Sequence, residues 1–263
     1  RATAETPVDH EHVLDSDSIL SLAYLPRSLL VLGGGVIASE YASMFAALGC
    51  RVTQADRNER PLSFVDPELT AFYLEALEAR GSRFMPRSRV QSMAFDGIAQ
   101  VQTRFENGET IATDKVLVAL GRVANVAELE LQAAGVTLTR AGHIAVDEDL
   151  QTEVPGIYAA GDVIGPPALA STAMEQGRRA ACHALGLCSL GVLRERIPVG
   201  IYTIPEISSV GLDETAARAH FGGALVGRAS FGEIARGQIA GAQRGILKLV
   251  ADPDGRRVVG VQV

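Results

Sequence analysis

Three consecutive glycines between an apolar run and a helical pattern restrict this chain to a small set of folds. Residues 29–32 are all apolar, the glycines follow at once, and apolar residues then recur at helical spacing from Val36 to Leu48. Residues 33–38 fit the pattern G-x-G-x-x-G/A. In that setting, after a strand and before a helix, the pattern predicts a dinucleotide-binding βαβ unit.

Each small residue of this turn has a separate physical purpose. Gly33 permits the tight turn, Gly35 lets the backbone approach a pyrophosphate, and Ala38 is small enough for the helix to lie on the strand. The N–H groups that open the helix carry a partial positive charge that attracts phosphate. The predicted phosphate-binding turn consists of Gly33, Gly34, Gly35, Val36 and Ile37. A glycine-rich turn with no ligand is the alternative.

An acidic residue lies where a nucleotide ribose would need it. Asp56 comes 21 residues after Gly35, at the end of the next predicted strand, and can accept hydrogen bonds from an adenosine ribose. Its carboxylate repels a 2′-phosphate and so favours NAD, whereas the adjacent Arg57 could bind that phosphate. The sequence therefore favours NAD and leaves NADP open, and Arg57 could equally be a solvated surface charge.

The rest of the chain reads as an α/β protein followed by a strand-rich end. Asn107-Gly108 and Asp96-Gly97 predict hairpin turns, and thus a small antiparallel insertion. Helices are predicted over residues 15–25, 36–48, 67–80 and 169–185. Strands are predicted over residues 29–32, 51–55, 115–120, 144–146, 157–160, 200–203, 208–210, 245–250 and 258–263.

Composition excludes several classes of function. With 24 Lys+Arg against 31 Asp+Glu, the net charge of −7 argues against a nucleic-acid or anionic-membrane surface. No apolar stretch reaches the ~18 residues that a membrane span needs. Three cysteines form no disulfide framework, which favours a reducing, cytoplasmic location. The chain starts at Arg1 and ends within a predicted strand, so we expect a fragment of a longer protein.

A second motif completes a family pattern. In residues 152–163 an apolar segment ends in Gly161-Asp162, where an acid at the carboxyl end of a strand could bind a polyol hydroxyl. Together with residues 33–40, residues 119–122 with Asn125, and residues 202–206, this segment resembles the pyridine nucleotide-disulfide oxidoreductases, which are flavoproteins with two dinucleotide-binding domains. Residues 15–20, 197–211 and 235–241 most resemble the soluble NAD(P) transhydrogenase branch of that family.

The resemblance implies an order of domains along the chain. Residues 1–26 would belong to an FAD-binding domain and a linker helix, and residues 27–122 would form the Rossmann-like NAD(P)-binding domain. Residues 123–196 would return to the FAD-binding α/β domain, and residues 197–263 would begin an α+β interface domain that forms a homodimer.

The resemblance also implies cofactor contacts. Asp162, after Gly161, would bind the ribityl or pyrophosphate side of FAD, and the backbone at Ala173 and Met174 would lie near the flavin ring. Glu40 would lie near the junction of flavin and nicotinamide, or else act only as a carboxylate in the helix dipole. The remaining predicted contacts, on the nicotinamide nucleotide, come from Gly121 and Arg122.

The implied function is hydride transfer between NADPH and NAD through FAD. The family's amino-terminal FAD motif and redox cysteine pair would precede Arg1, and Cys50, Cys182 and Cys188 do not replace that pair because their spacing is wrong. We interpret these cysteines as small apolar residues. A dithiol reductase resembling dihydrolipoamide dehydrogenase, and a non-catalytic nucleotide-binding module, are the alternatives. His10 and His12 lack a third ligand, so no metal site is predicted.

Overall fold

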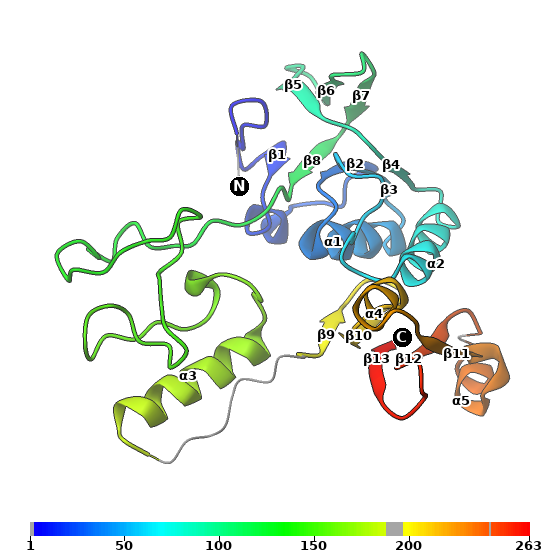
Figure 1. Cartoon of the computed structure of the whole chain (residues 1–263). Coiled ribbons are helices and arrows are strands. Elements are labelled where there is room, and N and C mark those ends of the chain that lie inside the picture. Colours follow the sequence, from blue (N-terminus) through cyan, green and yellow to red (C-terminus); the bar gives the residue numbers. More distant parts are fainter. Residues whose placement is uncertain (1–2, 188–196, 242) are drawn as a thin grey trace. The chain divides into compact units, whose positions relative to one another are not determined.

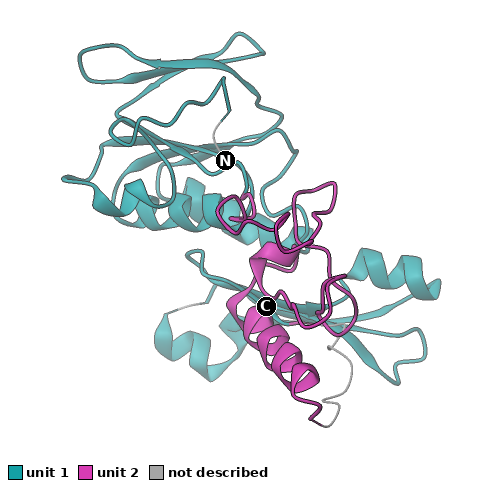
Figure 2. Ribbon diagram, turned by 90° about the vertical axis from the view of Figure 1, so that its left-hand side faces the viewer, with its two compact units in different colours: residues 1–121, 198–263 teal, residues 122–197 magenta. Residues whose placement is uncertain are grey.

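A computed structural model describes residues 3–187, 197–241 and 243–263, which fall into two compact units (Figure 2). Unit 1 contains residues 1–121 and 198–263, and unit 2 contains residues 122–197. The chain leaves unit 1 after Gly121 and returns to it at Pro198. Within the described residues, no helix is both long and apolar enough to span a membrane.

Unit 1 is built on a parallel five-stranded sheet, which confirms the predicted Rossmann-like core (Figure 1). Its strands lie in the order β1 (Val13–Leu14), β8 (Lys115–Val118), β2 (Ser28–Leu32), β3 (Arg51–Ala55) and β4 (Arg83–Met85). Helices α1 (Val36–Ala47) and α2 (Pro67–Glu78) connect successive strands. Residues 1–26, which the sequence assigned to the flavin-binding domain, contribute edge strand β1 to this sheet.

Alternate residues of each strand face opposite sides of the sheet and enter different cores. Leu29 and Val31 of β2 pack with α1 and α2, in a cluster that also contains Tyr73. Leu30 and Leu32 pack on the other side, against the antiparallel insertion. Because both faces are covered, β2 is buried throughout and apolar from Leu29 to Leu32, as buried parallel strands are.

The antiparallel insertion is confirmed, with turns at both predicted positions. Strands β5 (Val90–Phe95), β6 (Val101–Phe105) and β7 (Thr110–Thr113) form a three-stranded sheet (Figure 1). Gly97 and Gly108 have φ values of +80° and +86°, a region that glycine enters at little cost.

The predicted helix over residues 15–25 is wrong, because only Ser18–Ser21 forms a short 3₁₀ helix, η1. The carboxylate of Asp15 accepts hydrogen bonds from the Ser18 amide (2.8 Å) and the Ser18 hydroxyl (2.7 Å). Local side-chain bonds of this kind compete with helical backbone bonds.

Unit 2 contains helix α3 (Ala170–Ala184) and a 3₁₀ helix, η2 (Asp162–Ile164). The strands predicted over 144–146 and 157–160 are wrong: each segment makes one isolated bridge, Leu138 with Ile144 and Gln151 with Tyr158. Gly156, at φ +85°, turns the chain back on itself, so residues near Tyr158 bond to their own preceding loop instead of a long ladder.

The carboxyl-terminal part of unit 1 is an antiparallel sheet, as the strand-rich pattern predicts. Its strands lie in the order β11 (Leu225–Ser230), β12 (Ile246–Ala251), β13 (Val258–Gln262), β10 (Ile207–Gly211) and β9 (Val199–Ile201). The sequence reading missed β11 and three short helices: α4 (Glu214–Phe221), η3 (Phe231–Glu233) and α5 (Ala235–Ala240). Strand β13, the last of the chain, is not an edge, because it pairs with β12 and β10.

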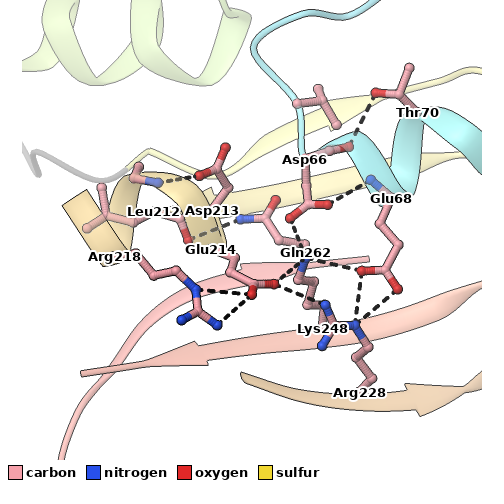
Figure 3. Close-up of polar contacts among 12 residues, drawn as sticks. Asp66, Glu68, Thr70, Leu212, Asp213, Glu214, Arg218, Arg228, Lys248 and Gln262 are labelled. Carbon is pink, nitrogen blue, oxygen red and sulfur yellow. Dashed lines mark hydrogen bonds and ion pairs between the residues drawn. The ribbon is translucent and has the colours of Figure 1, made fainter. Parts of the chain in front are cut away.

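A buried ion cluster joins helix α2 to the carboxyl-terminal antiparallel sheet of unit 1. Lys248 of β12 is 4% exposed, and its Nζ lies 2.8 Å from Asp66, 3.1 Å from Glu68 and 3.2 Å from Glu214 (Figure 3). Asp66 also accepts the Glu68 amide at the start of α2, so one buried carboxylate both caps a helix and binds a lysine. Hydrogen bonds from Arg218 and then Lys248 lower the pKa of Glu214 to about 2.

Replacing Lys248 with Met is expected to lower the free energy of unfolding by about 3–5 kcal/mol, because it leaves the Asp66 carboxylate buried without its partner. Chemical denaturation measures this. Adding Asp66→Asn, which keeps an acceptor for the Glu68 amide, should restore much of the loss. Arg244→Gln is the control, since Arg244 is 76% exposed against Glu75 and should cost less than about 1 kcal/mol. A loss for Lys248→Met no larger than the control's contradicts the prediction.

Candidate functional site

The glycine turn lies at the point where the strand order of the parallel sheet reverses. After β2, the chain crosses to β3 on one side, while β8 lies on the other side. The Gly33 amide donates to the Ala55 carbonyl at 2.8 Å, and the Ala119 amide donates to the Leu32 carbonyl at 2.9 Å. Ligands of open α/β sheets bind at such a switch point, outside the carboxyl ends of the strands.

Steric contacts explain why this turn needs glycine. Gly33 has φ +126°, and a Cβ added there would lie 2.4 Å from the Ala119 carbonyl oxygen. Gly35 precedes the first residue of α1, and a Cβ there would meet nothing within 4 Å. Ala38 is completely buried. The space beside Gly35, next to the unpaired N–H groups that open a helix, fits a phosphate group.

Asp56 lies beside the turn, as its spacing predicts. A Cβ on Gly34 would come within 2.8 Å of the Asp56 Cγ, so these two residues are in close contact. Asp56 is 9% exposed, and its Oδ1 accepts the Asn58 amide at 2.8 Å. Arg57 is exposed. The Leu62 amide donates to the Gly34 carbonyl at 2.7 Å, which holds the loop after Asp56 against the turn.

A buried polar network lies beneath the turn, and the sequence pattern did not predict it. Gln54 donates from Nε2 to the Gly33 carbonyl at 3.0 Å, and its Oε1 accepts the Tyr73 hydroxyl at 2.6 Å. Ser39 of α1 also accepts from Gln54, at 3.1 Å. Burial raises the pKa of Tyr73 well above its ordinary value. The one available signal was a long polar side chain, Gln54, in a strand that the sequence places in the βαβ unit.

Glu40 lies on α1 and binds the backbone of the segment that follows β9. Its Oε1 accepts the Tyr202 amide at 2.8 Å, and Ser43 Oγ, one turn further along, accepts the Ile204 amide at 3.1 Å. Residues 202–206, one of the four family motifs, are thereby held against the helix that the glycine turn opens. The placement of Glu40 near a flavin stays a prediction.

In unit 2, two predicted site residues form an ion pair. Arg122 and Asp162 are 40 positions apart in the sequence, and their side chains approach to 2.7 Å. The Gly161 amide donates to the buried Gln176 of α3 at 2.7 Å. A Cβ on Gly161 would lie 3.4 Å from the Ala173 Cβ, so the motif packs on the first turn of α3.

Two further predicted cofactor contacts are Met174 and Gly121. Met174 is 74% exposed. Gly121, in unit 1, follows β8 with φ +107°.

Comparisons with known proteins agree with this geometry. Residues 3–177 match the model of the pyridine nucleotide-disulphide oxidoreductases, and residues 197–263 match the dimerisation domain of the same group. The chain belongs to the pyridine nucleotide-disulphide oxidoreductase family. This confirms the resemblance seen in the sequence motifs.

Curated relatives include soluble pyridine nucleotide transhydrogenases. That of Mycobacterium tuberculosis is 44% identical over 258 residues, 97% of this chain and 54% of the relative. That of Colwellia psychrerythraea is 40% identical over 256 residues, again covering 54% of the relative. The chain thus spans about half the length of the curated relatives it matches.

Solved structures that share this fold include a flavoprotein disulfide reductase. LpdA from Mycobacterium tuberculosis superposes with a TM-score of 0.93 at 30% identity, over all of this chain and 57% of that one. The HOCl-induced flavoprotein disulfide reductase RclA from Escherichia coli gives 0.90 at 28% identity, over all of this chain and 60% of that one.

The cysteines add no redox pair within the part of the chain that the structure describes. Cys50 is buried and free, and burial raises the pKa of its thiol to about 11. Cys182 is free and half-buried, whereas Cys188 lies outside the described residues. Across the same described ranges, no group of three or more His, Cys, Asp or Glu side chains is arranged to hold a metal ion.

Replacing Tyr73 with Phe is expected to lower the free energy of unfolding by about 1–3 kcal/mol, because Gln54 Oε1 loses its hydroxyl donor in a buried site. Thermal or chemical unfolding measures the change. Tyr24→Phe removes a hydroxyl from a side chain that is 61% exposed and should cost less than about 0.5 kcal/mol. Equal costs for the two variants would show that the network adds nothing.

Proposed function

We propose that the protein containing this chain is a flavin-dependent oxidoreductase that transfers hydride between NADPH and NAD, with FAD as the intermediate carrier. The observation that carries this proposal is the glycine turn at the switch point, with Asp56 packed beneath Gly34 and open space beside Gly35. Similarity to soluble pyridine nucleotide transhydrogenases along nearly the whole chain supports the choice of reaction.

In this proposal the nicotinamide nucleotide lies across the carboxyl ends of β2, β3 and β8. The α1 amides that follow Gly35 hold its pyrophosphate, because they have no acceptors within the helix. Asp56 accepts the hydroxyls of the adenosine ribose through the carboxylate oxygen that Asn58 leaves open. Gly121, at the end of β8, borders the nicotinamide half. Arg57 supplies charge at the ribose end.

The flavin contacts are assigned to unit 2. FAD, when bound, would supply the hydride-accepting and hydride-donating chemistry. Asp162 would hold its ribityl or pyrophosphate side, with Gly161 and the amides near Ala173 and Met174 beside it. Arg122, which the sequence predicts beside the nicotinamide nucleotide, forms an ion pair with Asp162. Glu40 would lie toward the junction of flavin and nicotinamide.

The match of residues 197–263 to a dimerisation domain supports a homodimer, and we assign the protein to the cytoplasm on its cysteine usage. A dithiol reductase is the second candidate, favoured by the structural similarity to LpdA and RclA. A nucleotide-binding module without catalysis is the third.

Hydride transfer is tested on the complete gene product, purified with FAD bound. We expect NADPH-dependent reduction of an NAD analogue, followed by its absorbance, and no dihydrolipoamide-dependent reduction of NAD. A flavin-loaded protein that reduces NAD only with a dithiol would establish the reductase instead. A protein that catalyses neither reaction would support the third candidate, a nucleotide-binding module without catalysis.

Gly35→Ala tests the phosphate position separately from the chemistry. The added methyl group would occupy the open space beside the turn, so affinity for NAD should fall at least tenfold while the fold is retained. Isothermal titration calorimetry measures the affinity, and circular dichroism measures the fold. Gly227→Ala in β11 is the matched control, since a Cβ there also meets nothing within 4 Å. Unchanged NAD affinity in Gly35→Ala would place the phosphate elsewhere.

A further inference from the structure

The loop that leaves β4 lies directly against the residues that leave β3. The Asp56 amide donates to the Met85 carbonyl at 3.1 Å, and the Ser88 amide donates to the Asp56 carbonyl at 2.8 Å. Between these bonds, the Arg87 amide donates to the Asn58 carbonyl at 3.1 Å. Residues 86–88 are therefore tied to the ribose-binding end of the proposed nucleotide site, although they come about 30 positions later in the sequence.

Arg87 is held in this position with an exposed charge. Its φ of +52° is one that side-chain-bearing residues rarely adopt, and the bond to Asn58 fixes it. Its guanidinium pairs with the Glu59 carboxylate, three residues beyond Asp56. The two side chains are 77% and 65% exposed, and a pair so exposed to solvent contributes little to stability. The Arg87 guanidinium is thus available to another anion.

The chemistry of the ribose end gives this guanidinium a role. A 2′-phosphate would add nearly two negative charges beside the Asp56 carboxylate, which repels them. A nucleotide with that phosphate therefore needs compensating cations, and a planar guanidinium matches phosphate geometry. Arg57, next to Asp56, supplies one. Arg87, from the loop after β4, supplies a second.

We propose that Arg87 is a specificity-determining residue that binds the 2′-phosphate of NADP, and that Glu59 competes with the phosphate for the Arg87 guanidinium. This assignment rests on the proposed function, which requires one site to accept both NAD and NADP. Asp56 accepts hydrogen bonds from the free ribose hydroxyls of NAD, whereas Arg57 and Arg87 together bind the 2′-phosphate of NADP. Release of Arg87 from Glu59 converts the site from one preference to the other.

The test compares two ligands that differ only in the 2′-phosphate: ADP-ribose and 2′-phospho-ADP-ribose. Affinities of both for the 263-residue chain are measured by calorimetry at low ionic strength. Arg87→Gln should weaken the phosphorylated ligand about tenfold, as loss of a charge-assisted phosphate contact does, and change ADP-ribose less than about twofold. Glu59→Gln should strengthen the phosphorylated ligand alone.

Arg83→Gln is the matched control. Arg83 is the first residue of β4, the strand that precedes the Arg87 loop, and it is also paired with an exposed acid, Glu109, at 3.3 Å. It is aligned with Thr53, toward the start of β3, whereas Met85 is aligned with Ala55, next to Asp56. Arg83→Gln removes the same charge and should change neither affinity beyond about twofold, because exposed charges at a distance are screened.

Four results would overturn the inference. Equal weakening of both ligands by Arg87→Gln would give Arg87 a structural role only, and no effect on either would give it none. The same loss in Arg83→Gln would reduce the effect to net charge. If the unaltered chain binds neither ligand, the proposed nucleotide site is wrong and this inference is wrong with it. If the chain binds ADP-ribose but Arg87→Gln changes neither affinity, only this inference is overturned.

Discussion

The close approach of two backbones at Gly33 is the constraint on which the rest of unit 1 depends. The chain turns from β2 into α1 with φ +126° while the Ala119 carbonyl of the neighbouring strand lies against it. Any side chain at Gly33 would separate β2 from β8, and the helix could no longer begin within three residues of the strand. Because α1 begins there, its free amides face the carboxyl edge of the sheet, where anions bind.

Polar groups inside unit 1 support this turn from below. Gln54 is completely buried, and its amide satisfies the Gly33 carbonyl, which would otherwise lie unpaired in the core. Tyr73 extends the support to α2, so the turn, β3 and both helices share one network. A buried polar network that is fully satisfied fixes a unique arrangement of its elements, which an apolar core alone does less well.

The Lys248 cluster performs a similar task between the parallel sheet, through its helix α2, and the carboxyl-terminal antiparallel sheet. Asp66 is tied to α2 by capping and to β12 by its ion pair, so the nucleotide-binding sheet and the antiparallel sheet share one buried carboxylate. The hydrogen bonds from Glu40 and Ser43 to residues 202 and 204 make a second link, from α1 itself. The helix that opens the proposed nucleotide site thus contacts the segment that matches a dimerisation domain.

The amino-acid sequence by itself determined the βαβ unit, the hairpin insertion and the position of Asp56, because each depends on local rules: helical spacing, glycine conformations and a fixed number of residues per strand. It misjudged residues 15–25 and 157–160, where side-chain bonds and missing strand partners outweigh propensity. Only the tertiary structure decided that Gln54 lies under Gly33, that Arg122 meets Asp162 and that Arg87 lies beside Asn58. Those contacts join residues 21, 40 and 29 positions apart, and such separations are closed by the tertiary packing within each unit, which no local pattern encodes.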